Sequence, residues 1–162
     1  MNCGIMDQFI IGMGKKDHAI ALDTGTLEYT YAPVQLKQAS IVIMNTNKQR
    51  GLTDSKYNER RAECEHALSQ LQTVVKIKNL CDLKETEFEK VQHVITSPVE
   101  RKRARHAVLE NIRVKKAIAA LEKNDIEEFG ALMNASHISL RDDYEVTGIE
   151  LDTLVEVHGT SQ

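Results

Sequence analysis

Apolar and polar residues alternate near the start of the chain, and this pattern predicts a β-hairpin over residues 17–33. Its arms are residues 18–22 and residues 27–31, and the second arm alternates apolar and polar positions as a half-buried strand does. Between them lies Asp-Thr-Gly-Thr, a turn-forming segment in which Gly25 is expected to take a positive φ. The continuous apolar run at residues 40–44 then predicts a short buried strand.

Beyond residue 50 the apolar positions recur at helical spacing, so the rest of the chain is predicted to be helical. The predicted helices run from Asp54 or Ser55 to Leu71, over residues 84–95 with an end at Ser97-Pro98, over residues 100–122, and from two capping boxes at Asp125/Glu128 and Thr147/Glu150. The predicted fold class is therefore α+β, with helices outnumbering strands. Periodicity alone assigns no function.

Composition narrows the class of protein. Hydrophobic residues make up 41% of the 162 residues and charged residues 28%, which is typical of a globular domain, or of one domain plus part of another. Aromatic residues make up 4% and Trp is absent, so the core is expected to be aliphatic. A formal net charge of -3 argues against a nucleic-acid-binding protein. The local basic run is interpreted as the solvated face of a helix; it consists of Arg101, Lys102, Arg103 and Arg105.

Cysteine and histidine usage predicts neither a disulfide framework nor a metal site. Three cysteines without regular spacing and the lack of a signal peptide favour a reducing cytoplasm. No apolar run approaches the ~20 residues that span a bilayer. The six histidines do not pair at metal-ligand spacing. Residues 12–16, Gly-Met-Gly-Lys-Lys, lack the spacing of a phosphate-binding loop and are interpreted as a turn.

Three segments carry residues suited to chemistry. Asp7 lies at a predicted helix start, where a carboxylate can orient or deprotonate a substrate hydroxyl, or simply cap the helix. Residues 45–47, Asn-Thr-Asn, are followed by Arg50 and Tyr57; they suit a binding loop, or a solvated turn. Ser136-His137 with residues 140–144, Leu-Arg-Asp-Asp-Tyr, suit substrate binding, although a structural ion-pair network is favoured.

Four segments in order resemble the galactokinases of the GHMP small-molecule kinase family. They are Cys3-Gly-Ile-Met-Asp-Gln-Phe9, Gly14-Lys-Lys-Asp-His-Ala19, Asn45-Thr-Asn47 through Ser55-Lys-Tyr57 with Arg60-Arg61, and Ser136-His137 through Leu140-Arg-Asp-Asp-Tyr-Glu145. The resemblance covers residues 3–157. It implies that residues 1–38 end an N-terminal sugar- and ATP-binding domain, that residues 39–157 form a truncated GHMP-kinase C-terminal domain, and that residues 158–162 are a non-family tail.

The resemblance also implies an activity and the residues behind it. The family phosphorylates the C1 hydroxyl of galactose with ATP and Mg²⁺. Asp7 matches the aspartate beside that hydroxyl, as general base or electrostatic orienter, because positioning and charge stabilisation dominate phosphoryl transfer. Gly4 matches a backbone contact to the sugar and Tyr57 a side-chain contact.

Three family motifs are absent from the sequence, so an active site that is incomplete by itself is expected. They are Gly-Glu-His-x-Asp-Tyr, the phosphate-cradling Gly-Leu-Ser-Ser-Ser-Ala and Gly-Ala-Gly-Phe-Gly-Gly, and no cofactor-binding residue is identified in their place. The first hypothesis is a cytoplasmic galactokinase with impaired or no turnover alone. The others are a non-catalytic galactose-binding protein and an interaction module that binds a complementary chain carrying the missing motifs.

Overall fold

The computed structural model of the chain describes residues 4–37, 39–48 and 54–159. These residues form two compact units. One contains the described residues up to Ile41 together with residues 114–132, and the other contains those of 42–113 and those from Met133 onward. The α+β class predicted from the sequence is confirmed.

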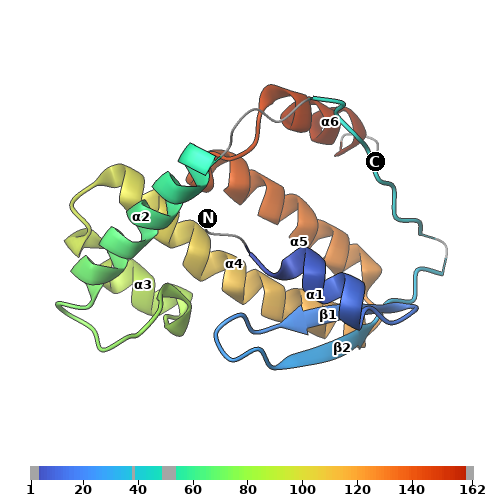
Figure 1. Ribbon diagram of the computed structural model, residues 1–162, viewed down its shortest axis with the longest axis horizontal. Helices are drawn as coiled ribbons and strands as arrows, with labels where there is room; N and C mark the ends of the chain where they lie inside the picture. The colour runs from blue at the N-terminus through green and yellow to red at the C-terminus, as the bar shows by residue number, and fades with distance from the viewer. Residues whose placement is uncertain (1–3, 38, 49–53, 160–162) are drawn as a thin grey trace. The chain divides into compact units, whose positions relative to one another are not determined.

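The first unit contains helix α1 (Met6–Met13) and a hairpin of β1 (His18–Leu22) and β2 (Tyr29–Pro33), drawn in blue in Figure 1. The strands pair antiparallel, with Ala19 opposite Ala32 and Ala21 opposite Thr30. The predicted hairpin is thus confirmed, but its second strand begins two residues later than expected.

The turn of the hairpin does not use its glycine in the predicted way. Gly25 has a negative φ, and Leu27 instead takes the left-handed conformation with φ 64°. The Asp23 carboxylate accepts hydrogen bonds from the backbone N–H of Gly25 and Thr26, and the Leu27 N–H donates to the Asp23 carbonyl at 2.7 Å. These bonds form an Asx-type turn, in which the left-handed conformation falls on Leu27, two positions after Gly25.

Aromatic contacts attach α1 to the hairpin. The Phe9 and Tyr29 rings meet edge to face with centroids 5.3 Å apart, and the Tyr31 hydroxyl donates a 2.7 Å hydrogen bond to the Met13 carbonyl. No residue of α1 is buried, and Ile11 exposes 86% of its surface. The helix is therefore held by a few aromatic contacts rather than by a core.

The second unit is helical. Its elements are α2 (Asp54–Leu71), η1 (Leu80–Asp82), α3 (Glu85–Val91), η2 (Gln92–Val94), the first part of α4 (Pro98–Glu122), the last part of α5 (Ile126–Ser139), the π-turn η3 (Leu140–Tyr144) and α6 (Ile149–Gly159). Figure 1 shows α2 and α3 beside the first turns of α4. Aliphatic side chains of these helices and of the segments between them pack around the ring of Phe88. The buried residues of this core are Ala67, Leu71, Leu80, Leu83, Phe88, Ile95, Ala104 and Val108.

Capping residues explain where the helices begin. The Glu128 N–H donates to the Asp125 carboxylate at 3.0 Å, as the predicted cap requires. Helix α4 begins at Pro98, two residues earlier than predicted, because proline suits the first helical position and the Ser97 hydroxyl accepts from the Glu100 N–H. Helix α6 begins at Ile149, so Gly148 precedes it rather than the predicted cap Thr147.

The strand predicted at residues 40–44 does not form. Ile41, Val42 and Ile43 expose 69%, 72% and 92% of their surface. A strand needs a hydrogen-bonding neighbour, and the strands of the described ranges, β1 and β2, pair only with each other. The apolar run is therefore an exposed segment without strand pairing.

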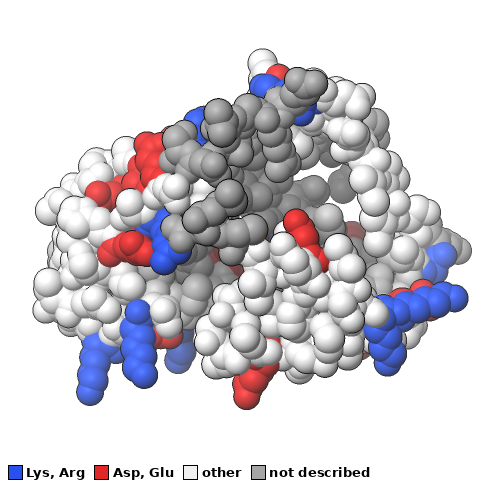
Figure 2. All heavy atoms as spheres, in the orientation of Figure 1, with Lys and Arg blue, Asp and Glu red and all other residues white. Residues whose placement is uncertain are grey.

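Side chains of both charge signs occur on the face drawn in Figure 2. Within the described part of the chain, no helix is long and apolar enough to cross a membrane.

Candidate functional site

Gly4 and Asp7 lie together at the start of α1. Gly4 is an exposed residue two positions before the helix, and Asp7 lies in the exposed first turn. The free N–H groups of a first helical turn favour negative charge nearby. A Cβ atom built on Gly4 has no heavy atom within 4 Å. The chain itself therefore does not require glycine at this position, and another molecule has room to approach the backbone.

Tyr57 lies near the start of α2 and belongs to the other unit. Its side chain exposes 52% of its surface. The residues with described side chains before and after it, 56–59, are all exposed. A half-exposed phenol on a helix surface is available to a ligand, because its ring offers an apolar face and its hydroxyl a hydrogen bond.

The segment Asn45-Thr46-Asn47 forms a local polar turn. The Asn47 N–H donates to the Asn45 side chain at 2.9 Å, and Asn47 takes a left-handed conformation with φ 53°. Lys48 extends the contacts to α6 through a 2.6 Å ion pair with Glu150. Arg50, the other polar residue predicted in this loop, lies outside the described residues. The geometry matches a solvated turn, the interpretation that the residues alone favour over a binding loop.

The third predicted segment is joined to neighbouring helices by polar side chains. The Ser136 hydroxyl donates to Glu110 at 2.6 Å, and the His137 Nε2 atom lies 3.3 Å from the Asp152 carboxylate, an ion pair only when His137 is protonated. The Arg105 guanidinium contacts the buried Asp143 carboxylate at 2.7 Å. These contacts agree with the structural interpretation of the segment.

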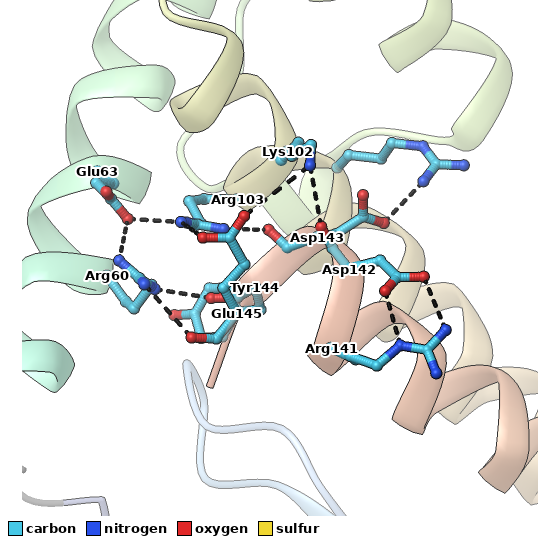
Figure 3. Close-up of polar contacts among 10 residues, drawn as sticks. Arg60, Glu63, Lys102, Arg103, Arg141, Asp142, Asp143, Tyr144 and Glu145 are labelled. Carbon is cyan, nitrogen blue, oxygen red and sulfur yellow. Dashed lines mark hydrogen bonds and ion pairs between the residues drawn. The ribbon is translucent and has the colours of Figure 1, made fainter. Parts of the chain in front are cut away.

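Two buried arginines complete this network, shown in Figure 3. Arg103 of α4 is 2% exposed and donates to the Glu63 carboxylate, the Asp143 carbonyl and the Glu145 carboxylate at 2.9, 2.7 and 2.9 Å. Arg60 of α2 is 6% exposed and donates to the Glu63 carboxylate at 3.0 Å and to the carbonyl of Tyr144 at 2.7 Å. The prediction of a solvated basic face is therefore wrong for Arg103, whose carboxylate and carbonyl partners permit burial.

The arginines stabilise an unusual helix end. Helix α5 continues into the π-turn, after which Glu145 takes a left-handed conformation with φ 54°. The carbonyl oxygens of residues 142–145 accept hydrogen bonds from Lys102, Arg103 and Arg60. Cations are favourable at a helix C-terminus, where carbonyl groups lack helical partners. The separate hydrogen bond from Arg103 to the Glu145 carboxylate lowers the pKa of Glu145.

The half-buried Tyr144 and the buried His106 form a cluster at the turn. Their rings stack with centroids 4.5 Å apart, and the His106 Nδ1 atom lies 2.9 Å from the Ser139 hydroxyl. Burial, assisted by the positive charge of Arg113, lowers the pKa of His106 to about 4. Burial also raises the pKa of Tyr144 to about 12, with further contributions from Cys64 and Tyr57. Both rings are therefore neutral near pH 7.

The glycine-containing segment at residues 12–16 does not form a phosphate-binding loop. The glycines of residues 12–16 lie at the C-terminal end of α1, and the Gly14 N–H donates to the Ile10 carbonyl. A helix C-terminus presents carbonyl groups and repels anions. Among the described residues, no group of three His, Cys, Asp or Glu side chains is placed to hold a metal ion.

Known galactokinases resemble the chain over nearly its whole length. It is 63% identical over 157 residues to a galactokinase of Clostridium acetobutylicum and 64% identical over 157 residues to one of Fusobacterium nucleatum, which covers 97% and 96% of this chain. No protein-family model matches it. The crystal structure of Lactococcus lactis galactokinase complexed with galactose superimposes on 97% of the chain with a TM-score of 0.92 and 53% identity.

The chain belongs to the galactokinase family. The resemblance seen in the sequence motifs is thus confirmed, and the α+β fold is that of part of a galactokinase. The chain spans about 40% of the length of each of these galactokinases. The division into residues 1–38, 39–157 and 158–162 stays a prediction, as do the roles of Gly4, Asp7 and Tyr57.

Sequence reasoning did not single out Arg60 and Arg103 of this galactokinase-family chain as buried residues. A signal for both was present. Arg60 precedes Cys64 by four residues and Ala67 by seven, so it shares their helix face, and Arg103 precedes Ala107 by four. A cation on the apolar face of a helix indicates a buried partner, because an unpaired buried charge is strongly unfavourable.

Proposed function

We propose that the chain provides the sugar-binding residues of a galactokinase, which transfers a phosphoryl group from ATP to the C1 hydroxyl of galactose. The observation that supports this most directly is the similarity, with a TM-score of 0.92, to a galactokinase whose crystal structure is a complex with galactose. In this proposal the exposed backbone at Gly4 and the half-exposed phenol of Tyr57 contact the sugar.

Asp7 orients the reacting hydroxyl or accepts its proton. Its carboxylate is exposed in the first turn of α1, where it is accessible to a hydroxyl donor. In phosphoryl transfer a carboxylate acts mainly by positioning the nucleophile, and the phosphates and Mg²⁺ need further donors. Because the sequence lacks the three family motifs that would supply such donors, we propose that this chain turns over little or no galactose by itself.

The test is ATP-dependent phosphorylation of galactose by the purified chain, its Asp7→Asn variant and the control Glu28→Gln, which neutralises an exposed hairpin carboxylate. We expect no turnover in any of the three. Turnover that Asp7→Asn abolishes and Glu28→Gln preserves would confirm Asp7 and overturn the proposal of an incomplete site.

Galactose binding is tested separately by calorimetry at millimolar sugar. Gly4→Ala and Gly12→Ala each place a Cβ atom in space that is open within the chain, so neither should disturb the fold. We expect weak galactose heat in the unaltered chain and in Gly12→Ala, and its loss in Gly4→Ala, where the methyl group obstructs the sugar. Absence of heat in the unaltered chain would overturn the sugar-binding role.

Exposed apolar surface supports a second candidate, an interaction module that binds a complementary galactokinase segment. Ile43 exposes 92%, Ile11 86% and Met6 74% of their surface. Contiguous exposed apolar side chains mark interaction surfaces, and Ile41 and Val42, next to Ile43 in the chain, are exposed as well. Mixing the chain with a separate polypeptide that carries the three absent motifs should restore galactose phosphorylation, whereas no association between the two would contradict this candidate.

Both candidates place the protein in the cytoplasm, the location predicted from cysteine usage. Fractionation of cells that express the chain tests this.

A further inference from the structure

Arg60 is the first buried side chain along the described part of α2. The four residues before it, 56–59, are exposed, and Tyr57 is one of them. Apolar contacts of α2 with the core begin only at Cys64 and Ala67. The turn of α2 that presents Tyr57 is therefore not fixed by apolar packing, and helix ends without packing fray.

Polar bonds from Arg60 fix this turn instead. Its Nε atom donates to the Tyr144 carbonyl at 2.7 Å and its Nη2 atom to the Glu145 carbonyl at 3.4 Å, 84 and 85 residues along the chain. Its Nη1 atom donates to Glu63, the carboxylate that also accepts from Arg103. Figure 3 shows the Arg60 guanidinium directed at the carbonyl groups of the turn. Arg60 thus joins α2 to the backbone after the π-turn.

Tyr57 and Arg60 are three residues apart and are therefore neighbours on the helix surface. We propose that Arg60 is a positioning residue for galactose: by joining α2 to the Tyr144–Glu145 backbone, it determines where Tyr57 meets the sugar. This inference rests on the proposed function of Tyr57 as a galactose contact.

The Tyr144 side chain also indicates that Tyr57 lies near the turn. Its pKa is raised chiefly by burial and by Cys64, and the electrostatic effect of Tyr57 adds to the rise. Tyr57 therefore lies within electrostatic range of the same residue whose carbonyl Arg60 holds.

The neighbouring arginine is a matched control. Arg61 exposes 53% of its side chain and pairs with Glu65 four residues along the same helix at 2.7 Å. Replacing either arginine by lysine keeps the charge, but lysine lacks the planar fork that reaches several acceptors at once. Of these two arginines, Arg60 uses the fork to join separate segments of the unit, whereas Arg61 pairs within its own helix.

The first experiment follows the position of Tyr57 without any ligand. The chain has no Trp, so Tyr57→Trp introduces a single tryptophan, whose fluorescence is excited selectively at wavelengths where the remaining tyrosines do not absorb. In this background we expect Arg60→Lys to lower the fluorescence anisotropy at residue 57 and to increase quenching by acrylamide, while Arg61→Lys changes neither. Equal anisotropy and quenching in the two variants would overturn the proposal.

The second experiment measures galactose affinity in chains that retain Tyr57. We expect Arg60→Lys to weaken the affinity by about 10- to 100-fold, since small displacements of a binding group have effects of this size. Arg61→Lys should stay within about twofold, as expected for an exposed pair. Unchanged affinity in a folded Arg60→Lys chain, checked by circular dichroism, would contradict the inference.

A failure of the proposed function is distinguishable from a failure of this inference. Absence of galactose heat in the unaltered chain overturns the role of Tyr57 in sugar binding, and the fluorophore at residue 57 still decides whether Arg60 holds the helix. Glu63→Gln provides a second variant if Arg60→Lys loses helicity. It preserves both carbonyl bonds of Arg60, so we expect a smaller change in anisotropy; no change at all would count against the network.

Discussion

The unit that contains α2 and α3 and the unit that contains the β-hairpin differ in how much of their surface they bury. In the helical unit, eight apolar residues from α2 to α4 form one buried cluster, and two arginines have carboxylate and carbonyl partners beside it. In the hairpin unit, the buried apolar side chains among the described residues are Ala32, Ala120 and Leu121.

This difference shows that one part of the chain has its own core while the other exposes surface that suits a partner. A two-stranded hairpin is marginally stable without further packing. The aromatic contacts of α1 are the main attachment of that helix to the strands. The helical unit is therefore expected to set the unfolding midpoint of the protein, and changes in each unit test that expectation.

The largest expected effect comes from the core of the helical unit. Phe88→Ala removes a ring that is 2% exposed, and we expect a loss of about 3–5 kcal/mol in the free energy of unfolding. Phe9→Ala removes a half-buried ring that contacts Tyr29, and we expect about 1 kcal/mol. Urea denaturation followed by circular dichroism measures both. Equal losses would show that the two units are equally well packed.

Removal of a buried charge should have the next largest effect. Arg103→Met leaves Glu63, Glu145 and the Asp143 carbonyl without this donor, and we expect a loss of about 3 kcal/mol. Lys102→Met is the control, because its 53% exposed side chain makes longer contacts of 3.3 and 3.9 Å, and should cost less than about 1 kcal/mol. Similar midpoints for the two variants would mean that the network adds little stability.

Acid should weaken the helical unit through His106. Burial lowers its pKa to about 4 in the folded chain, whereas an unfolded histidine has a pKa of 6.5. The unfolded state therefore binds the proton first, so stability present above pH 6.5 is lost as the pH falls from 6.5 towards 4, by about 2–3 kcal/mol.

Urea midpoints measured between pH 7 and pH 4 test this, with His106→Gln as the comparison. The variant should be less stable at pH 7, but its urea midpoint should change less with pH, because glutamine does not bind a proton in this range. Parallel pH profiles for the two proteins would assign the acid sensitivity to other groups.

The smallest expected effect is a gain in the hairpin. Leu27 is 56% exposed and holds a left-handed φ of 64°, a conformation that glycine adopts without steric cost. Leu27→Gly should slow hydrogen exchange of the β1 and β2 amides, corresponding to about 0.5–1 kcal/mol. Thr24→Gly is the control, since Thr24 is exposed and has no positive φ, so glycine relieves no strain there. Faster exchange in Leu27→Gly would show that the Leu27 side chain stabilises the turn.

Local patterns in the sequence were sufficient for most elements. Alternation placed the hairpin, and helical spacing with the Asp125 cap placed α2, α4 and α5 within a few residues. The motifs also identified the family, because strings such as Cys-Gly-Ile-Met-Asp depend on residue identity rather than on folding. The boundary errors at Pro98 and Ile149 concern helix ends, where one capping residue can replace another at little cost.

By itself, then, the sequence determined the hairpin, the main helices, the family and the candidate residues Gly4, Asp7 and Tyr57. The tertiary structure decided which residues are buried by partners that are distant in the sequence, because periodicity describes only neighbouring positions. It left the apolar run at residues 40–44 exposed, since burial of a strand depends on a neighbour from elsewhere in the chain. It also buried Arg60 and Arg103, because their carboxylate and carbonyl partners lie up to 85 residues away and meet them only when α2, α4 and the π-turn come together.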